Sequence, residues 1–281
     1  MSASAGTTGH RPGILAGRHI LVTGVLTPHS LAFAAAREAL AQGAVVVLTS
    51  YGKARRLAER AARTLDPVPD VLELDVTDED DWAALTAELA DRWPRLDGAL
   101  HAVAYAPPSC LGKGMLGVPW EDVAVTLQIS AFSLKSLAEL AVAINDESHG
   151  CSIVGLDFDN RQAWPNYDWM GVAKSALEST SRYLARDLGP RGIRVNLVAA
   201  GPIRSTAARS IPAFNTNVPL WVEQAPLGWD PDDPGAVGRA CVALWSDLLP
   251  ATTGEILHVD GGCHAVGAPS APTRAYAVEG S

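Results

Sequence analysis

Short apolar runs recur along the chain, and longer stretches with helical periodicity separate them. The runs are rich in β-branched residues and nearly continuous, which is typical of strands buried on both faces of a parallel sheet. They cover residues 19–24, 45–50, 71–76, 99–104, 151–158, 194–201 and 255–262. The pattern therefore predicts seven strands.

Helical patterns fill the intervals between these runs. They cover residues 30–42, 53–65, 78–93, about 119–143, about 166–188 and 234–247. The first two intervals have about the length of one crossover helix, which fits consecutive βαβ units. We predict an α/β fold of the Rossmann type, with a doubly wound, parallel, seven-stranded sheet in a single domain over residues 14–267.

Three segments depart from this alternation. Residues 1–13 and 268–281 are aperiodic and rich in small residues, so we expect a mobile N-terminus and a mobile C-terminal tail. Residues at about 205–235 are rich in proline with scattered aromatic residues. Connections of this length are uncommon without a function, so we interpret the segment as a substrate lid, with an ordinary long surface loop as the alternative.

Composition excludes several classes of protein. The 281 residues are 48% hydrophobic with a formal net charge of −9, which disfavours a nucleic-acid binder. The four cysteines form no CxxC pair, so we expect neither a disulfide framework nor a metal site, and a reduced cytoplasm is the natural compartment. The first 13 residues lack an apolar core and no run of 18 apolar residues occurs, so we expect neither secretion nor membrane association.

The stretch PNYDWMGVAKSAL places Tyr167 and Lys174 seven positions apart. Seven residues make nearly two α-helical turns, so both side chains project from one face of the predicted helix. The spacing permits a shared chemical site. Taken alone, such spacing more often belongs to an unrelated pair of surface residues.

The stretch TGVLTPHSLAF after the first strand fits a phosphate-binding turn. Such a turn needs a tight bend, a helix N-terminus aimed at the phosphates, and small residues where backbone meets phosphate. Gly24 supplies the bend, and Ser30 and Ala32 supply small groups at the start of the helix. The GxGxxG motif is absent, so a plain β–α turn stays open.

The ends of the second and third strands bear on the nucleotide. Asp75 and Val76 close the third run, where the aspartate would accept a hydrogen bond from an adenine amino group or simply cap a turn. The second strand ends at Ser50 and Tyr51 without an acidic residue for a ribose 2′-hydroxyl. The basic residues that follow would either meet a 2′-phosphate or form a solvated helix face; they are Lys53, Arg55 and Arg56.

Five segments are specific when taken together and in this order: SIVGLDFD, YDWMGVAKSALES, NLVAAGPIRS, PLGWD and LPATTGEILHVDGG. Together they resemble the NADH-dependent enoyl-acyl-carrier-protein reductases of actinobacteria, in the short-chain dehydrogenase/reductase superfamily, over about residues 13–267. Ordinary members of the superfamily place tyrosine and lysine four apart, whereas this family uses the spacing of Tyr167 and Lys174. The family also replaces the later glycines of the phosphate turn with serine and alanine, as at Ser30 and Ala32.

The resemblance implies an oxidoreductase of fatty-acid synthesis. NADH would supply a hydride to the β-carbon of a trans-2-enoyl thioester, carried on acyl carrier protein or coenzyme A. Tyr167 would donate to the enolate oxygen as its charge develops, and Lys174 would hold the nicotinamide ribose. Phe158 stands where carbonyl reductases of the superfamily have a serine, which suits a thioester with an apolar chain; core packing is the alternative for this ring.

The resemblance also implies a set of cofactor contacts. Residues 201–203 would line the nicotinamide amide, Ser205 would lie near the pyrophosphate, and Tyr51 would pack against the adenosine. NADH is preferred over NADPH because Tyr51 and Gly52 offer no dedicated phosphate fork. The full set is Gly24, Val25, Leu26, Ser30, Leu31, Tyr51, Asp75, Val76, Ala102, Val103, Ala104, Lys174, Gly201, Pro202, Ile203 and Ser205.

The chain departs from the family pattern after the fourth strand. His-Ala-Val-Ala at 101–104 stands where the family usually has His-Ser-Ile-Gly. A hydroxyl is lost at Ala102 and a methyl is added at Ala104, which leaves open a reductase of a specialised pathway that acts on another enoyl or imine-like intermediate. A cofactor-binding regulator is a third alternative, against which the intact Tyr167 and Lys174 argue.

Assembly is the last expectation. The apolar helices at about 119–143 and 166–188 carry more hydrophobic surface than one sheet face needs, and the family pairs these helices between subunits. We therefore expect a homotetramer; full burial of both helices within one chain is the alternative.

Overall fold

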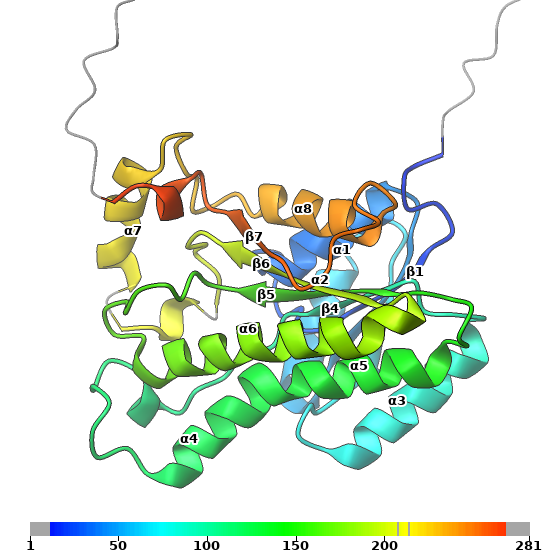
Figure 1. Cartoon of the computed structure of the whole chain (residues 1–281), viewed down its shortest axis with the longest axis horizontal. Helices are drawn as coiled ribbons and strands as arrows, with labels where there is room; N and C mark the ends of the chain where they lie inside the picture. The colour runs from blue at the N-terminus through cyan, green and yellow to red at the C-terminus, as the bar shows by residue number, and fades with distance from the viewer. Residues whose placement is uncertain (1–11, 207, 213, 268–281) are drawn as a thin grey trace, which may run out of the picture.

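All seven predicted strands form one parallel sheet. The computed structural model describes residues 12–206, 208–212 and 214–267, so the predicted mobile ends fall almost entirely outside the described residues. The strand order is β3-β2-β1-β4-β5-β6-β7, which confirms the doubly wound, Rossmann-type sheet (Figure 1). The strands are β1 (His19–Val22), β2 (Val45–Ser50), β3 (Asp70–Glu73), β4 (Gly98–His101), β5 (Ser152–Asp157), β6 (Arg194–Ala200) and β7 (Ile256–Val259).

Helices cover both faces of the sheet, as Figure 1 shows. On one face lie α1 (Leu31–Ala41), α2 (Arg55–Ala62) and α8 (Gly235–Trp245). On the other lie α3 (Glu79–Arg92), α5 (Ser133–Ile144) and α6 (Asp168–Leu188). Each face therefore buries its own apolar cluster, which is why the strands are apolar on both sides.

The carboxyl ends of the strands meet at one edge of the sheet. The chain leaves β1 and β3 before the predicted apolar run ends, at Val22 and Glu73 rather than at residues 24 and 76. The apolar residues beyond the strand ends belong to loops at this edge. In open α/β sheets ligands bind outside the carboxyl ends, where the strand order reverses, which here is between β1 and β4.

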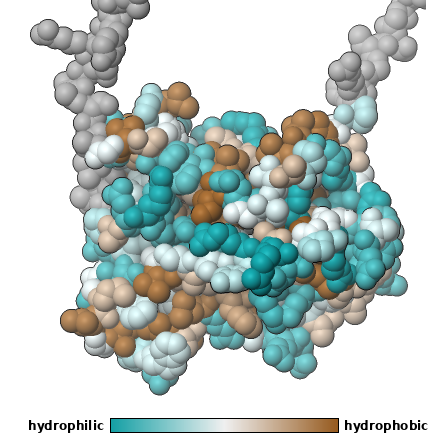
Figure 2. Space-filling model, in the orientation of Figure 1, coloured by the Kyte–Doolittle hydropathy of each residue, from teal (hydrophilic) through white to brown (hydrophobic). Residues whose placement is uncertain are grey.

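The helix α4 (Trp120–Leu127) continues through a π-helical turn (Gln128–Phe132) into α5. The stretch Trp120–Ile144 is long and apolar enough to cross a membrane by length and composition. Its residues Leu134, Leu137 and Ala141 are fully buried against the sheet, so it serves as a core helix of the domain. Figure 2 shows apolar side chains gathered on the surface near the start of α4, where Leu116 and Trp120 are exposed.

The segment interpreted as a lid contains a helix that the sequence analysis did not place. This is α7 (Phe214–Gln224), which has Pro219 in its interior. Its Val218 and Trp221 are buried, whereas Val222 is 39% exposed. The helix forms because its buried side packs onto the domain, a tertiary effect that proline-rich local sequence conceals.

Trp245 provides a test of the apolar core between the sheet and the helices α1, α2 and α8. It is fully buried, and its indole N–H donates to the carbonyl oxygen of Ala99 at 3.3 Å. We expect Trp245→Ala to lower the free energy of unfolding by about 3–5 kcal/mol, measured by urea unfolding followed with far-ultraviolet circular dichroism. Leu248→Ala is the matched control, because Leu248 is 64% exposed and its loss costs about 0.5 kcal/mol or less. Equal losses would contradict this assignment of the core.

Candidate active site

The structure brings Phe158, Tyr167 and Lys174 together at the end of β5. Phe158 directly follows β5, and Tyr167 is the residue before α6. Their ring centroids lie 5.3 Å apart in an edge-on arrangement. The Lys174 ammonium, buried on α6, donates to the carbonyl oxygen of Leu156 at 2.6 Å. The tyrosine and lysine noted in the sequence therefore belong to one cluster, in which Lys174 is buried and the two rings are half-buried.

Two tryptophans extend this cluster into an apolar wall. Trp164 lies in the loop between β5 and α6, and its ring centroid is 5.3 Å from that of Phe158. Trp221 of α7 lies 5.4 Å from Phe158 and 5.0 Å from Trp164. Phe158 therefore packs against α7 as well as against Tyr167, and the sequence analysis gave no role to Trp164.

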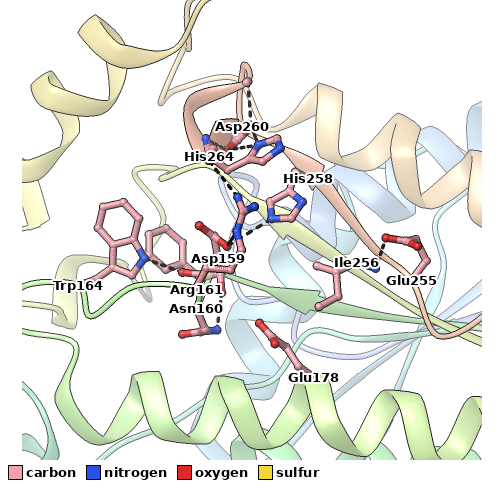
Figure 3. A network of polar contacts seen from close by, with 12 residues as sticks. Asp159, Asn160, Arg161, Trp164, Glu178, Glu255, Ile256, His258, Asp260 and His264 are labelled. Atoms are coloured by element: carbon pink, nitrogen blue, oxygen red, sulfur yellow. Dashed lines mark hydrogen bonds and ion pairs between the residues drawn. The ribbon is translucent and has the colours of Figure 1, made fainter. Parts of the chain in front are cut away.

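A polar network fixes the loop that carries Phe158 (Figure 3). The buried Asp159 carboxylate accepts from the guanidinium of Arg161 at 3.0 Å and lies 3.4 Å from Nε2 of His258 on β7. The rings of His258 and His264 stack at 3.9 Å, and His264 pairs with the buried Asp260 at 2.9 Å.

Further contacts complete this network. Arg161 also donates to the carbonyl oxygen of His264 at 3.0 Å. Gln224 of α7 donates to the carbonyl oxygens of Cys263 and Val266. The turn after β7 thus contacts both the Phe158 loop and α7. The sequence analysis did not find this network because its residues are far apart in the sequence.

Burial controls the protonation states of the cluster. It raises the pKa of Tyr167, and the charge of Asp157 adds to that rise, so the hydroxyl stays a donor. It lowers the pKa of Lys174, while Asp157 opposes that change. Burial and the nearby Lys174 lower the pKa of His101 to about 3, so this ring is neutral.

The hydrogen bonds of His101 identify its tautomer. The Ser133 hydroxyl donates to the carbonyl oxygen of Ile129, so it accepts from Nε2 of His101 at 2.7 Å. The proton therefore lies on Nε2. The other ring nitrogen, Nδ1, is buried and has no partner among the described residues.

Asp157, the last residue of β5, received no role in the sequence analysis. It is 5% exposed, and both of its carboxylate oxygens lack a hydrogen-bond partner among the described residues. Burial raises its pKa to about 7, against the opposing effect of Lys174. A charged residue that ends an apolar strand is a visible signal, but a turn residue gives the same pattern.

The predicted phosphate turn has the expected shape. Gly24 has φ of +80°, and a Cβ at this position would lie 2.0 Å from the carbonyl oxygen of Ala102. Ser30 caps α1 by accepting from the N–H of Phe33 at 3.3 Å, and the first turn of α1 has no acidic side chain. The positive end of α1 is thus open to an anion. Val25 is buried in this loop, and Leu26 and Leu31 are half-buried.

The residues predicted to contact the adenosine differ in their surroundings. Tyr51 is 50% exposed at the end of β2. Asp75 accepts from the N–H and hydroxyl of Thr77 at 2.9 and 2.7 Å, so it performs the turn role that the sequence left open, and Val76 beside it is half-buried. Arg55 pairs with Glu73 at 2.7 Å and with Glu59 at 3.0 Å, which removes it from a 2′-phosphate site.

The remaining predicted contacts follow β4 and β6. Gly201 admits the Trp229 ring, because a Cβ there would come within 2.7 Å of it, and the Trp229 indole donates to the carbonyl oxygen of Pro202 at 2.9 Å. Ile203 is buried, and the Ser205 hydroxyl accepts from the N–H of Ala208.

After β4, Ala102 and Val103 are half-buried, whereas Ala104 is exposed. The Ala102 N–H donates to the Thr23 hydroxyl at 3.0 Å. The predicted contacts at β1, β4, β5 and β6 therefore all lie at the carboxyl edge of the sheet.

Two buried polar groups near the phosphate turn and the end of β4 lack partners among the described residues. They are the Thr27 hydroxyl in the phosphate turn and Nδ1 of His101, the last residue of β4. Buried polar groups are normally hydrogen-bonded, so such groups at one edge indicate a polar ligand. With the glycine turn and the open end of α1, they fit a nicotinamide dinucleotide.

Comparison with known proteins agrees with this geometry. A family model described as enoyl-(acyl carrier protein) reductase matches residues 24–264. The enoyl-acyl-carrier-protein reductase (NADH) of Mycolicibacterium smegmatis is 42% identical over 265 residues, which are 89% of this chain and 97% of that protein. The corresponding protein of Mycobacterium avium is 41% identical over 264 residues, with the same two shares.

A more distant relative matches over a similar length. The enoyl-acyl-carrier-protein reductase (NADH) of Escherichia coli is 34% identical over 254 residues, which are 89% of this chain and 95% of that protein. The chain therefore belongs to the enoyl-acyl-carrier-protein reductase family of the short-chain dehydrogenase/reductase superfamily.

Proposed function

We propose that this protein reduces the trans-2 double bond of enoyl thioesters carried by acyl carrier protein, with NADH, in fatty-acid synthesis. The observation that carries the proposal is the cluster at the end of β5. There Phe158 packs against Tyr167, and the Lys174 amine donates to the carbonyl oxygen of Leu156. A serine that would polarise an isolated ketone is replaced there by the aromatic ring. The test is NADH oxidation with a panel of enoyl thioesters and ketones.

Each group of the cluster has a task in this reaction. NADH supplies the hydride when bound. The Tyr167 hydroxyl, protonated at neutral pH, donates to the thioester oxygen as charge develops on it. Lys174 holds the nicotinamide ribose and, as a nearby cation, favours the enolate. Phe158 and its neighbouring tryptophans exclude water from the acyl chain.

The loops at the carboxyl edge would hold the rest of the cofactor. The phosphates would lie at the turn of Gly24 and at the N-terminus of α1, near Ser205. Residues 201–203 would contact the nicotinamide amide, and Tyr51 would pack on the adenosine. The ion pairs of Arg55 support NADH over NADPH, since they occupy a guanidinium that a 2′-phosphate would need.

One observation favours a second candidate function. Ala104 is exposed at a position where the family usually has glycine. Its methyl group therefore projects from the loop whose backbone would lie close to the ligand. A reductase acting on another enoyl or imine-like intermediate in a specialised pathway would use such a reshaped pocket. Turnover of those acceptors in preference to simple enoyl thioesters in the same panel would support it.

We also propose a cytoplasmic homotetramer. Phe132 in the π-helical turn and Tyr183 on α6 are 56% and 59% exposed, and Trp120 at the start of α4 is 67% exposed. These residues lie on the helices through which the family pairs its subunits. Association would remove this apolar surface from water.

Tyr167→Phe tests the proposed donor. The variant keeps the ring but loses the hydroxyl, so we expect kcat to fall by about a hundredfold to a thousandfold while KM changes little. The measurement is steady-state NADH oxidation with an enoyl thioester. Tyr183→Phe, on the same helix but 59% exposed, is the matched control and is expected to keep wild-type kcat. Unchanged turnover in Tyr167→Phe would remove this hydroxyl from the mechanism.

The lid predicts a dependence on acyl length. Each methylene buried against the apolar wall contributes about 0.8 kcal/mol, or about fourfold in kcat/KM, as long as the wall encloses it. The lid is short and Val222 of α7 faces outward, so we expect the gain to level off at medium chain lengths. Measurement of kcat/KM across enoyl thioesters of increasing length tests this. A steady rise through the longest chains would show that the lid does not limit the site.

Charge placed on the exposed helix surface tests the tetramer. We expect light scattering to give a tetrameric mass for the wild type at micromolar concentration and a smaller mass for Phe132→Lys, because the ammonium would have to be buried. Leu57→Lys is the control, since Leu57 is 49% exposed on α2, on the opposite face of the sheet. A monomeric wild type would rule out the assembly.

A further inference from the structure

The side chain of Asp157 faces α6 from inside the molecule. Side chains alternate along a strand, and Leu156 belongs to the apolar cluster under α1 and α8. Asp157 therefore points to the opposite face, where Ile153 joins the cluster under α6. The carboxyl group is 5% exposed, so it lies between the end of β5 and the helix that carries Lys174.

A carboxylate in this position needs a partner. Neither oxygen has one among the described residues, and an unpaired buried charge is strongly unfavourable. The Lys174 amine lies at the same strand end, because it donates to the carbonyl oxygen of Leu156, the residue before Asp157. The amine makes no hydrogen bond with the Asp157 carboxylate among the described residues, so the two groups interact as buried charges.

We propose that Asp157 is a positioning residue for Lys174: its carboxylate is the buried countercharge that keeps the Lys174 amine protonated while this amine holds the cofactor. The inference rests on the cofactor-binding role proposed for Lys174. It assigns to Asp157 no contact with the substrate and no transfer of a proton to it.

Other titratable groups face Lys174, and they differ from Asp157. His101 of β4 is neutral, and Tyr167 keeps its proton, so neither supplies negative charge. Glu178 lies one helical turn beyond Lys174 on α6 and points toward the sheet (Figure 3). Glu178 lies 3.9 Å from Arg182, and its charge acts on Asp157, whose pKa it raises.

The charge of Asp157 depends on pH and acts on Lys174 against the effect of burial. Burial raises the pKa of Asp157 to about 7, so the carboxyl is neutral below that pH and anionic above it. Burial favours loss of the Lys174 proton as pH rises. The anion that forms as pH rises through this value opposes the loss of the Lys174 proton.

Direct titration of the lysine amine tests the pairing without any catalytic assay. The chain has four lysines, and the other three reach solvent, so carbon-13 NMR of labelled lysine gives a simple spectrum. The Lys174→Arg variant identifies the Lys174 signal by its absence. The spectra are recorded across pH for the wild type, Asp157→Asn and Glu178→Gln.

Asp157→Asn keeps the size and polarity of the side chain and removes the charge. We expect the titration midpoint of Lys174 to fall by about one pH unit or more, because a nearby opposite charge shifts a pKa by about one to three units. Glu178→Gln is the matched control: the Glu178 charge raises the pKa of Asp157, so its loss leaves Asp157 anionic and is not expected to lower the Lys174 midpoint. An unchanged midpoint in Asp157→Asn, or an equal fall in Glu178→Gln, would overturn the proposal.

A reciprocal experiment covers the case in which Asp157→Asn does not fold. Interacting groups change each other's titration, so loss of the ammonium must raise the midpoint of the Asp157 carboxyl. We expect this rise in Lys174→Met, measured by NMR of labelled aspartate against the wild type. The same Asp157 midpoint in both proteins would overturn the proposal.

The affinity for NADH links the pairing to the cofactor. The affinity for NADH is measured by fluorescence titration at a series of pH values. We expect Asp157→Asn to lose this affinity at a lower pH than the wild type does, and the pH of loss to follow the Lys174 midpoint in each protein. A Lys174 midpoint that moves while the affinity does not follow it would overturn the cofactor half of this proposal and the ribose role of Lys174 together. An unmoved midpoint would overturn the pairing alone and leave the proposed reductase function intact.

Discussion

The packing of α6 against the end of β5 determines where the reactive groups of this protein lie. It buries the Lys174 amine, which then has the carbonyl oxygen of Leu156 as its hydrogen-bond acceptor. It also sets Tyr167, just before the helix, against Phe158, just after the strand. Because both elements are rigid, the cluster is organised before any ligand binds, which is the arrangement that electrostatic stabilisation of a developing charge requires.

Much of the fold was predictable because buried parallel strands leave continuous apolar runs. The predictions failed at strand ends, where the apolar run continues after the chain has left the sheet; β3 ends at Glu73, and Asp75 then forms a turn with Thr77. The helix α7 was not placed, since Pro219 and its neighbours hide the helical spacing. In both cases tertiary packing decided what local sequence left open.

The site was predictable to the extent that its residues are close in sequence. Tyr167 and Lys174 lie seven residues apart, so their spacing permitted one site, and the resemblance to the reductase family then identified them as a pair. The network of Asp159, His258 and His264 joins segments about 100 residues apart, and no local pattern indicates such a contact. Arg55 is a residue for which the sequence left two roles open, and its ion pairs with Glu59 and Glu73 favour the solvated helix face over a phosphate contact.

The raised pKa of Asp157 makes the stability of the folded chain depend on pH. Its pKa in the folded chain is about 7, above the ordinary value for an aspartate. A group with a raised pKa contributes stability that is complete below its ordinary pKa and is lost as pH rises through the folded value. The folded chain is therefore destabilised by this carboxyl above pH 7, where the carboxyl is charged. Among the described residues, Asp157 is the charged group that opposes the effect of burial on the Lys174 amine. The loss of stability therefore accompanies the same anion that stabilises the lysine charge.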